Sequence, residues 1–292
     1  MSAAAKAYHA RMQRVLDHID AHLDEDLDVE RLAAVAAFSK FHFHRQFSEL
    51  FGLAVHRYVQ LARLKRASFR LAFRDDSSVT QIALDSDYQG PEAFARAFRR
   101  LSGQTPSGFR KDPQWLPWQE AYGPFNQDRS TNMQPFTDDK IDIIDVPATP
   151  VAIMTHLGDP ALIGENIRRF SDWRKQAGLR PPRSATFNIL HNDPLTTPPQ
   201  DYRLDLCAAT SGAAPSDDPA VAPGLIPAGR CARLRVTGAS DDVRPAVSFL
   251  YADWLPRSGE ALRDFPIYVQ RISFFPDVPE AEAVTDIFLP LV

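Results

Sequence analysis

Cysteine and long hydrophobic runs are scarce in this chain of 292 residues. The two cysteines, Cys207 and Cys231, are too few for a disulfide framework and lack metal-ligand spacing, so we expect reduced core residues. The longest apolar run near the N-terminus, Leu32 to Phe38, has seven residues, whereas a membrane-spanning helix needs about 20. No apolar segment with a cleavage site opens the chain, so we expect no signal peptide. These absences argue against a membrane protein or a disulfide-rich secreted protein, and favour a cytoplasmic one.

Residue sets for catalysis and metal binding are also missing. The sequence has no recognisable Ser/His/Asp set and no metal-binding motif. His156 and His191 have no neighbours at metal-ligand spacing, so we expect both to be structural or solvent-exposed. The sequence therefore predicts a protein that is not an enzyme and that uses no metal ion or cofactor.

The charge of the chain is distributed unevenly. The net charge is −4, but residues 1–112 hold 17 Lys and Arg against 14 Asp and Glu. Ser39 to Arg70 contains seven basic residues and one acid, and Tyr88 to Lys111 contains five and one. Solvated helix faces would explain part of this pattern. Two basic segments in an otherwise acidic chain nevertheless favour a polyanionic partner.

The first hundred residues have the apolar spacing and capping residues of short helices. The expected helices run from about Ala7 to Leu23, after caps at Asp28 and Ser39, from Val55 to Phe73, from Ser78 or Thr80, and from Pro91 to Gly103. A shift of 51 residues superposes five positions of these helices in one register: Phe43 on Phe94, Arg45 on Arg96, Phe47 on Phe98, Gly52 on Gly103 and Tyr58 on Phe109. Each copy is a short helix, a turn and a helix with a basic outer face, which is the helix-turn-helix arrangement.

The chain changes character after Lys111. Residues 113–138 hold four prolines and predict a linker, partly packed by Trp115 and Trp118. From residue 139 alternating apolar residues predict strands, and a shift of 80 residues superposes Val146-Pro147 on Ile226-Pro227. We predict a multidomain chain of α and α+β class: an all-α tandem helix-turn-helix domain over 1–112, the linker over 113–138, and a duplicated β-β-α-β effector-binding domain over 139–292.

Two sets of residues in the N-terminal part carry a family resemblance. They are Ser39-Lys-Phe-His-Phe-His-Arg-Gln-Phe47 with Gly52 in the first copy, and Phe94-Ala-Arg-Ala-Phe98 with Gly103-Gln-Thr-Pro-Ser107 in the second. With these motifs the chain resembles the AraC/XylS family of transcription regulators. That family has glycine before the aromatic residue of the second turn, where this chain has Asp87 before Tyr88. Asp tolerates left-handed backbone better than most residues, so we expect the turn to survive.

The C-terminal part, about residues 139–292, resembles the GyrI-like small-molecule-binding domain. The repeated Pro-x-x-x-x-Ala…Gly pattern, Trp254-Leu-Pro256 with Gly259, and Tyr268 carry this resemblance. It implies two repeats about a pseudo-twofold axis, with a ligand in the groove between them. Some domains of this kind are hydrolases, and the family name suggests inhibition of another protein. A small-molecule hydrolase and a protein-sequestering module therefore stay open as alternatives to a regulator.

The expected DNA contacts lie on the second helix of each copy and at its ends. The candidates are Lys40, Phe41, His44 and Arg45 in the first copy, and Gln89, Glu92, Arg96, Arg99 and Arg100 in the second. Arg45 is the strongest reader of sequence, because a guanidinium donates two hydrogen bonds to guanine. Glu92 repels phosphate, so the second copy is expected to discriminate less. Arg99 and Arg100 are expected to contact the DNA backbone.

The candidate effector-binding residues are aromatic or acidic: Phe187, Asp205, Tyr251, Trp254 and Tyr268. The resemblance implies that relatives sensing cationic drugs place a glutamate two residues before the late tyrosine, where this chain has Pro266. Burying a cation without a carboxylate loses several kcal/mol, and aromatic faces return about 0.5–2 kcal/mol per contact. Unless Asp205 or Glu165 reaches the groove, we expect a flat effector that is neutral or weakly polar.

The sequence thus predicts a DNA-binding transcription regulator, and the resemblance implies an activator that also contacts RNA polymerase. Its expected partners are double-stranded DNA and a small-molecule effector, without a membrane. The helix joining the two copies, roughly 17–19 residues long, spans about 25–28 Å at 1.5 Å per residue. One chain could then reach two grooves about one DNA turn, near 34 Å, apart. We therefore expect a monomer or a weak dimer.

Overall fold

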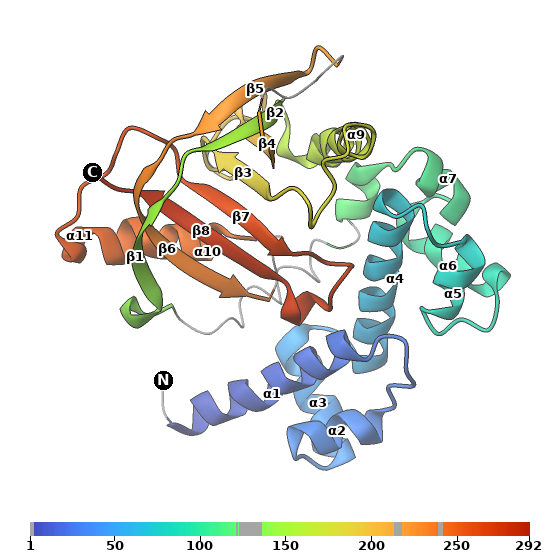
Figure 1. Cartoon of the computed structure of the whole chain (residues 1–292). Helices are drawn as coiled ribbons and strands as arrows, with labels where there is room; N and C mark the ends of the chain where they lie inside the picture. Colours follow the sequence, from blue (N-terminus) through green and yellow to red (C-terminus); the bar gives the residue numbers. More distant parts are fainter. Residues whose placement is uncertain (1–2, 121, 123–135, 213–217, 239–241) are drawn as a thin grey trace. The chain divides into compact units, whose positions relative to one another are not determined.

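The computed structural model describes residues 3–120, 122, 136–212, 218–238 and 242–292 (Figure 1). The chain forms two compact units. A helical unit contains Met1–Gln134 together with Phe275–Glu282, and a sheet unit contains Pro135–Phe274 and Ala283–Val292. The helical unit therefore includes a short segment from near the C-terminus, which joins two strands of the sheet unit.

Most helices of the first unit begin or end at the expected capping residues, but the first, expected from about Ala7 to Leu23, runs from Ala3 to Ala21, and the helix over Pro106–Lys111 was not expected. The helices are α1 (Ala3–Ala21), α2 (Val29–Ala36), α3 (Lys40–Phe51), α4 (Val55–Phe73), α5 (Val79–Leu84), α6 (Pro91–Ser102), α7 (Pro106–Lys111) and the short η5 (Glu280–Glu282). The side chains of Asp28, Ser39 and Ser78 accept hydrogen bonds from the first turns of α2, α3 and α5. Gly52 and Gly103 have φ of 68° and 75° and end α3 and α6, as left-handed glycines commonly do.

Both helix-turn-helix copies bury the same aromatic pair. Phe47 meets Tyr58 edge-on with ring centroids 5.4 Å apart, and Phe98 meets Phe109 edge-on at the same distance. The 51-residue shift superposes the first pair on the second, and all four rings are buried. The sequence repeat therefore corresponds to a repeat in packing.

The helical core extends beyond residue 112. Residues 115–120 are helical, and Trp115, Trp118 and Tyr122 are buried with the core residues of α1 to α7. Trp115 stacks on Phe73 at 5.5 Å and meets Phe109 edge-on at 5.4 Å. The segment expected to be a linker thus begins as part of the helical core. Residues 123–135 lie outside the described residues.

The sheet unit is built on one antiparallel sheet (Figure 1). Its elements are η1 (Asp138–Lys140), β1 (Ile141–Val146), β2 (Thr149–Leu157), η2 (Pro160–Leu162), α9 (Ile163–Gln176), β3 (Thr186–Leu190), η3 (Pro199–Asp201), β4 (Arg203–Ala209), β5 (Val221–Ile226), β6 (Gly229–Thr237), α10 (Arg244–Ser248), η4 (Phe249–Trp254), α11 (Leu255–Ser258), β7 (Tyr268–Ser273) and β8 (Val284–Pro290). The eight strands have the order β1-β6-β8-β7-β3-β4-β2-β5. If β1 to β4 are exchanged for β5 to β8, this order reads the same backwards.

The two copies in the sheet are related by this exchange, and each has one strand more than the predicted β-β-α-β unit. The additional strands, β4 and β8, follow β3 and β7 and pair with β2 and β6. The first strand of each copy pairs with the other copy, β1 with β6 and β5 with β2. Neither copy can therefore complete its hydrogen bonds alone, and the duplication forms one sheet.

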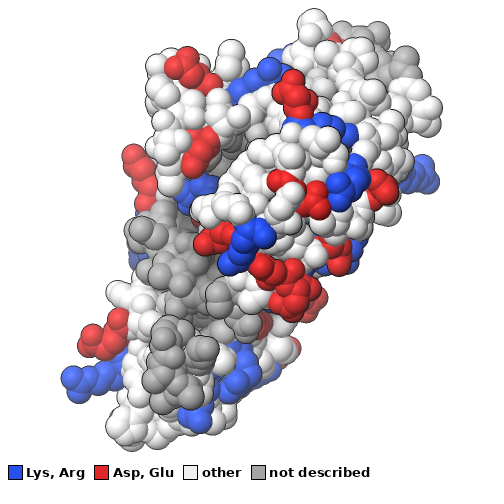
Figure 2. All heavy atoms as spheres, turned by 90° about the vertical axis from the view of Figure 1, so that its left-hand side faces the viewer, with Lys and Arg blue, Asp and Glu red and all other residues white. Residues whose placement is uncertain are grey.

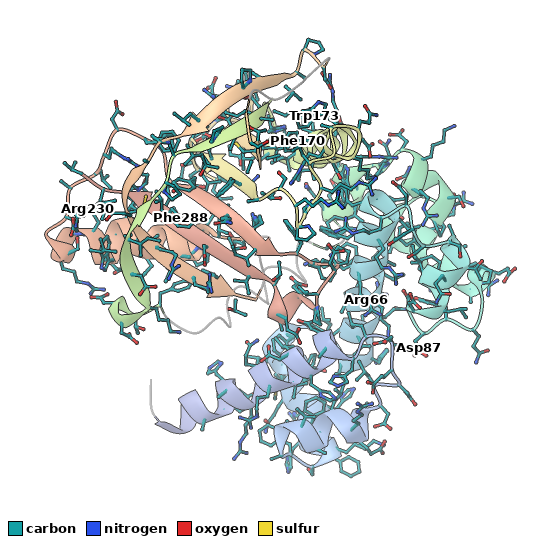
Figure 3. The ribbon with its side chains drawn as sticks, in the orientation of Figure 1. Arg66, Asp87, Phe170, Trp173, Arg230 and Phe288 are labelled. Carbon is teal, nitrogen blue, oxygen red and sulfur yellow. The ribbon has the colours of Figure 1, made fainter. Side chains whose placement is uncertain are left out.

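The two faces of the sheet differ in what covers them. Phe170 and Trp173 project from α9 and pack with Ala152, Met154 and Leu206 on one face (Figure 3). Side chains alternate between faces along a strand, so the opposite face carries the neighbours of these residues. That face holds a buried cluster with aromatic residues at its centre: Val151, Phe187, Ile189, Cys207, Ile226, Cys231, Tyr268 and Phe288. We call it the aromatic face.

Candidate DNA-binding and effector-binding sites

Helix α3 presents a stripe of side chains opposite its buried phenylalanines. Phe43, Phe47 and Phe51 are buried, whereas Phe41 is 86% exposed and His44 and Arg45 are exposed beside it. The expected reading residues of the first copy therefore share one solvent-facing surface. This placement follows from the helical period, since residues three and four positions apart lie on one face.

The basic residues of the first copy divide into free and engaged groups. Of the seven basic residues from Ser39 to Arg70, only the side chain of Arg45 lacks a hydrogen bond or ion pair with another described residue. Lys40 is paired with Glu30 of α2. Arg63 donates to the Leu23 carbonyl at 2.9 Å, and Arg70 lies 2.5 Å from Asp85. Part of the basic charge in this segment thus holds the helical unit together, and Arg45 is the cation left for another partner.

The second copy keeps more of its arginines unengaged. Glu92, Arg96 and Arg99 share one exposed face of α6, with Arg100 and Gln89 exposed near it. Arg96 and Arg99 form no ion pair with another described residue. Arg110 instead donates to the Ser77 carbonyl at 2.7 Å. On the face of the molecule drawn in Figure 2, by contrast, acidic and basic side chains are interspersed.

Both turns between the helices of a copy place a residue other than glycine in the left-handed region. Asp87 has φ of 60° and is labelled in Figure 3; Ala37 has φ of 53°. The expected turn at Asp87 is therefore present. The Asp87 carboxylate also lies 2.7 Å from Arg63 of α4, which fixes the turn against the helix that joins the copies.

Helix α4 buries a lysine among its apolar residues. Lys65 is 1% exposed, and its Nζ lies 2.9 Å from Oε1 of Glu280, which is 4% exposed. Phe275 lies within cation–π range of the same ammonium, and Asp277 receives two hydrogen bonds from Arg74. The segment Phe275–Glu282 is thus held on α4 by a buried ion pair, an exposed ion pair and an aromatic contact.

The aromatic face of the sheet unit brings together three of the five expected effector-binding residues. Tyr268 stacks on Phe288 with ring centroids 4.9 Å apart and lies 6.3 Å from Phe187 (Figure 3 labels Phe288). The Tyr268 hydroxyl lies 3.7 Å from Cys231 Sγ, and burial raises the pKa of this hydroxyl far above its usual value. Asp205 projects from β4 on the same face, two residues before Cys207 of the cluster.

Two buried carboxylates occupy equivalent places on this face. Asp205 lies 2.7 Å from both Thr155 Oγ1 and His191 Nε2 and accepts from Arg203 at 3.0 Å. Burial opposes its ionisation, but these hydrogen bonds outweigh burial and lower the pKa of the carboxyl. A shift of 81 residues superposes Asp205 on Asp286, which accepts two hydrogen bonds of 2.7 Å from Arg235. Each carboxylate is therefore already matched by an arginine.

The other expected effector-binding residues lie in a helical segment. Tyr251 and Trp254 belong to η4, and neither is a member of the aromatic face. The 81-residue shift superposes Trp173 on Trp254, and Trp173, which belongs to α9, packs on the face of the sheet opposite the aromatic face. The structure therefore places Trp254 as the counterpart of a core residue and leaves Tyr251 39% exposed. Glu165, in the first turn of α9, is also exposed.

Three residues with distinctive environments were not among the expected site residues. The repeat itself contains the signal for Asp286, because it superposes on Asp205. The signal for Lys65 is its position in the apolar stripe of α4, between Leu61 and Ser68. Arg263 lies in space near the start of β6. The repeat gives no signal for it, because the equivalent position of the first copy is not an arginine.

Comparison with family models divides the chain in the same two regions. Residues 139–292 match the GyrI-like small molecule binding domain, and residues 32–112 match a helix-turn-helix domain. The first match covers more than half of the chain. The chain therefore belongs to the GyrI-like family and carries an AraC-type helix-turn-helix domain at its N-terminus.

Two curated relatives match different parts of the chain. The "Probable transcriptional regulator YgiV" of Escherichia coli K12 is 36% identical over 152 residues, which are 52% of this chain and 95% of that protein. The "Uncharacterized HTH-type transcriptional regulator YbfP" of Bacillus subtilis is 35% identical over 103 residues, and the match spans about a third of each chain (35%). Among solved structures, the EcmrR–DNA complex in EcmrR-RPo matches 86% of this chain and 82% of that chain with a TM-score of 0.45 and 15% identity.

The two family matches, together with the transcriptional regulators among the similar proteins, define a DNA-binding transcription regulator. Within that class, the chain combines AraC-type helix-turn-helix units with a GyrI-like ligand-binding domain. No helix among the described residues is long and apolar enough to cross a membrane.

Proposed function

We propose that this regulator activates transcription in response to a flat aromatic effector that is neutral or weakly polar. The observation that carries the effector class is the state of the two buried carboxylates. Asp205 and Asp286 are each matched by an arginine, so neither is free to neutralise a cationic ligand. Phe187, Tyr268 and Phe288 supply the apolar surface for a flat ring.

The two copies of the helix-turn-helix are proposed to divide DNA recognition between them. Arg45 is unengaged on the outward stripe of α3, which supports direct reading of a guanine. In α6 the equivalent stripe carries Glu92 beside Arg96 and Arg99, which supports anchoring to phosphate with little discrimination. Helix α4 has 19 residues and is about 28 Å long, so one chain suffices for a site of two adjacent grooves.

The AraC-type helix-turn-helix domain supports RNA polymerase as a further partner. A regulator of this kind acts where the chromosomal DNA is, so we propose a cytoplasmic location. The alternatives of a hydrolase and of a protein-sequestering module differ from this proposal in one respect. Only a DNA-binding regulator requires affinity for DNA that falls steeply with salt.

Two measurements test the proposal. Selection from randomised DNA should return a binding consensus, and addition of neutral flat aromatics should change transcription from a promoter that carries it. Tryptophan fluorescence titrations should show tighter binding of a neutral aromatic than of a matched quaternary ammonium. Tighter binding of the cation, abolished in Asp205→Asn, would refute the proposed effector class. Absence of any DNA consensus would refute sequence-specific regulation.

A further inference from the structure

Arg263 is a half-buried residue beside the aromatic face, and its guanidinium is incompletely hydrogen-bonded. Its Nη1 donates to the carbonyl of Ala228, but the buried Nε and Nη2 make no hydrogen bond with another described residue. Buried donors without acceptors are rare in folded proteins, and those of a cation are the most unfavourable. The neighbouring acids along the chain do not satisfy these donors: Asp264 is exposed and forms no ion pair with Arg263, and Glu260 is engaged by Arg230 at 3.0 Å.

The position of the guanidinium follows from Gly229. This glycine opens β6 with φ of 144°, and a Cβ built on it would overlap the Arg263 guanidinium. Residues 229 and 231 lie on the same side of the strand, and Cys231 belongs to the aromatic face. Arg263 therefore lies on the aromatic face, beside Cys231. In agreement, its charge partly offsets the effect of burial, which raises the pKa of both Cys231 and Tyr268.

The pseudo-twofold symmetry of the sheet is broken at this point. The 80-residue shift superposes Gly229 on Thr149, which carries a Cβ where the second copy has none. In the 81-residue register that superposes Phe187 on Tyr268, Arg263 corresponds to Pro182, so the two ends of the aromatic face differ in this arginine. The backbone amide of Arg263 donates to the Pro290 carbonyl at 3.1 Å, which anchors the arginine to the end of β8.

We propose that Arg263 receives a hydrogen-bond acceptor of the effector, a carbonyl or carboxylate oxygen attached to its aromatic ring. This inference rests on the proposed function, because it assumes that the aromatic face binds the effector, and it extends the effector class from neutral rings to rings that carry a carboxylate. Nε and Nη2 of one guanidinium point in parallel and match an oxygen pair of a carboxylate or a single carbonyl oxygen. The ring of the effector then lies on Tyr268, two strands from β6 across the sheet.

Binding requires movement in the segment that carries the arginine. Tyr268 is 2% exposed, and Phe265 covers it edge-on with ring centroids 6.1 Å apart. Phe265 and Arg263 both lie between α11 and β7, in a segment whose backbone is held to the C-terminal residues by the bridge of Leu262 to Leu291 and by the Arg263 amide. The movement is therefore one of side chains: rotation of Phe265 exposes the Tyr268 ring, and the free donors of Arg263 turn toward the ligand.

The test compares three naphthalene probes on the full chain by isothermal titration calorimetry: 2-naphthamide, 2-naphthoate and a 2-naphthyl-trimethylammonium salt. Both acceptor-bearing probes should bind at least tenfold more tightly than the cation. Arg263→Met should weaken both acceptor-bearing probes tenfold or more and leave the cation unchanged or tighter. Arg263→Lys should give an intermediate loss, because lysine keeps the charge and loses the planar pair of donors.

Arg230→Met is the matched control, since Arg230 neighbours Gly229 on β6 and is labelled in Figure 3. It should bind all three probes as the unaltered chain does. The thermal midpoint of Arg263→Met should be unchanged or higher, because an incompletely bonded guanidinium is removed. Equal affinity of Arg263→Met and the unaltered chain for 2-naphthoate would overturn the inference and leave the proposed function standing. Failure of all three probes to bind would overturn the effector-binding proposal itself.

Discussion

The helical unit and the sheet unit are both duplicated, but they treat buried charge differently. In the helical unit Lys65 of α4 is buried opposite Glu280, and the pair leaves no charge uncompensated. In the sheet unit Asp205 and Asp286 are compensated, whereas Arg263 keeps buried donors without an acceptor. A folded protein is stabilised when its buried charges have partners. A buried charged group without a partner instead indicates a surface that binds another molecule. The two duplications also produce different surfaces. The two copies of the helical unit have separate outward faces, whereas the two copies of the sheet unit form one common face.

The largest effect is expected from shortening the helical unit. A fragment ending at Lys111 loses the buried rings of Trp115, Trp118 and Tyr122, each worth about 3–5 kcal/mol by analogy with truncation of core aromatics. We expect residues 1–111 to be largely unfolded by circular dichroism, and residues 1–134 to be more helical. Both fragments lack Glu280, so their difference measures residues 112–134 with their buried aromatic rings and not the ion pair of Lys65. Equal helicity and equal DNA binding would show that the helical unit ends at residue 111, as the sequence predicts.

The next largest effect tests the compensated charge. Lys65→Met leaves Glu280 buried without its partner, which should lower the free energy of unfolding by about 3–5 kcal/mol in urea titrations. The double variant Lys65→Met with Glu280→Gln should recover much of this loss, because Glu280 no longer carries a buried charge that has lost its ion pair. Arg263→Met in the sheet unit should show no such loss. If Lys65→Met and Arg263→Met destabilise the chain equally, the contrast between the units is wrong.

A DNA-binding experiment distinguishes the roles of the two helix-turn-helix copies. Arg45→Ala should weaken binding to a specific site by about 1–3 kcal/mol and relax one base position. Arg99→Ala should weaken matched and mismatched duplexes alike and lower the slope of log K against log salt by about 1. Titrations on both duplexes at several salt concentrations measure these effects. Equal loss of discrimination from the two variants would mean that both copies read sequence.

The carboxylates of the sheet unit predict a pH dependence. The pKa of Asp205 is lowered in the folded chain, so its contribution to stability is present above the ordinary aspartate pKa and is lost as pH falls through the lowered value. Asp205→Asn should therefore lower the midpoint of urea unfolding at pH 7 and flatten its fall toward pH 3. Asp142→Asn is the control, because Asp142 pairs with Arg233 at a more exposed position. Parallel pH profiles of Asp205→Asn and the unaltered chain would exclude this linkage.

The smallest effect concerns the turns of the two copies. Ala37→Gly removes the left-handed strain of a Cβ but increases the freedom of the unfolded chain, so a net gain of up to about 1 kcal/mol is expected. Asp87→Gly should gain less or lose stability, because it also removes the ion pair with Arg63. Thermal unfolding of the two variants makes the comparison. A loss in Ala37→Gly would show that its turn is not strained.

Helix periods and caps were enough to place most elements from sequence. The apolar spacing and caps gave α4 its observed ends and located Asp28, Ser39, Gly52 and Gly103, because these signals act within one or two turns of the chain. The outward stripe of α3 followed from the same period. The left-handed turn at Asp87 was also predictable, since it depends on backbone sterics at one residue. The two internal repeats predicted the duplicated architecture.

Long-range pairing was beyond these local signals. Clustered basic residues in the first copy suggested a DNA surface, but the tertiary structure engages Arg63, Lys65 and Arg70 internally. Trp254 was expected in the pocket as an aromatic residue; the sequence repeat pairs it with Trp173, and the tertiary structure shows that Trp173 belongs to the core on the opposite face of the sheet. Local sequence determined the helices, the turns and the repeats of this protein. Which charges are compensated, as with Lys65 and Glu280 some 215 positions apart, was decided by the tertiary fold, because that alone brings distant residues together.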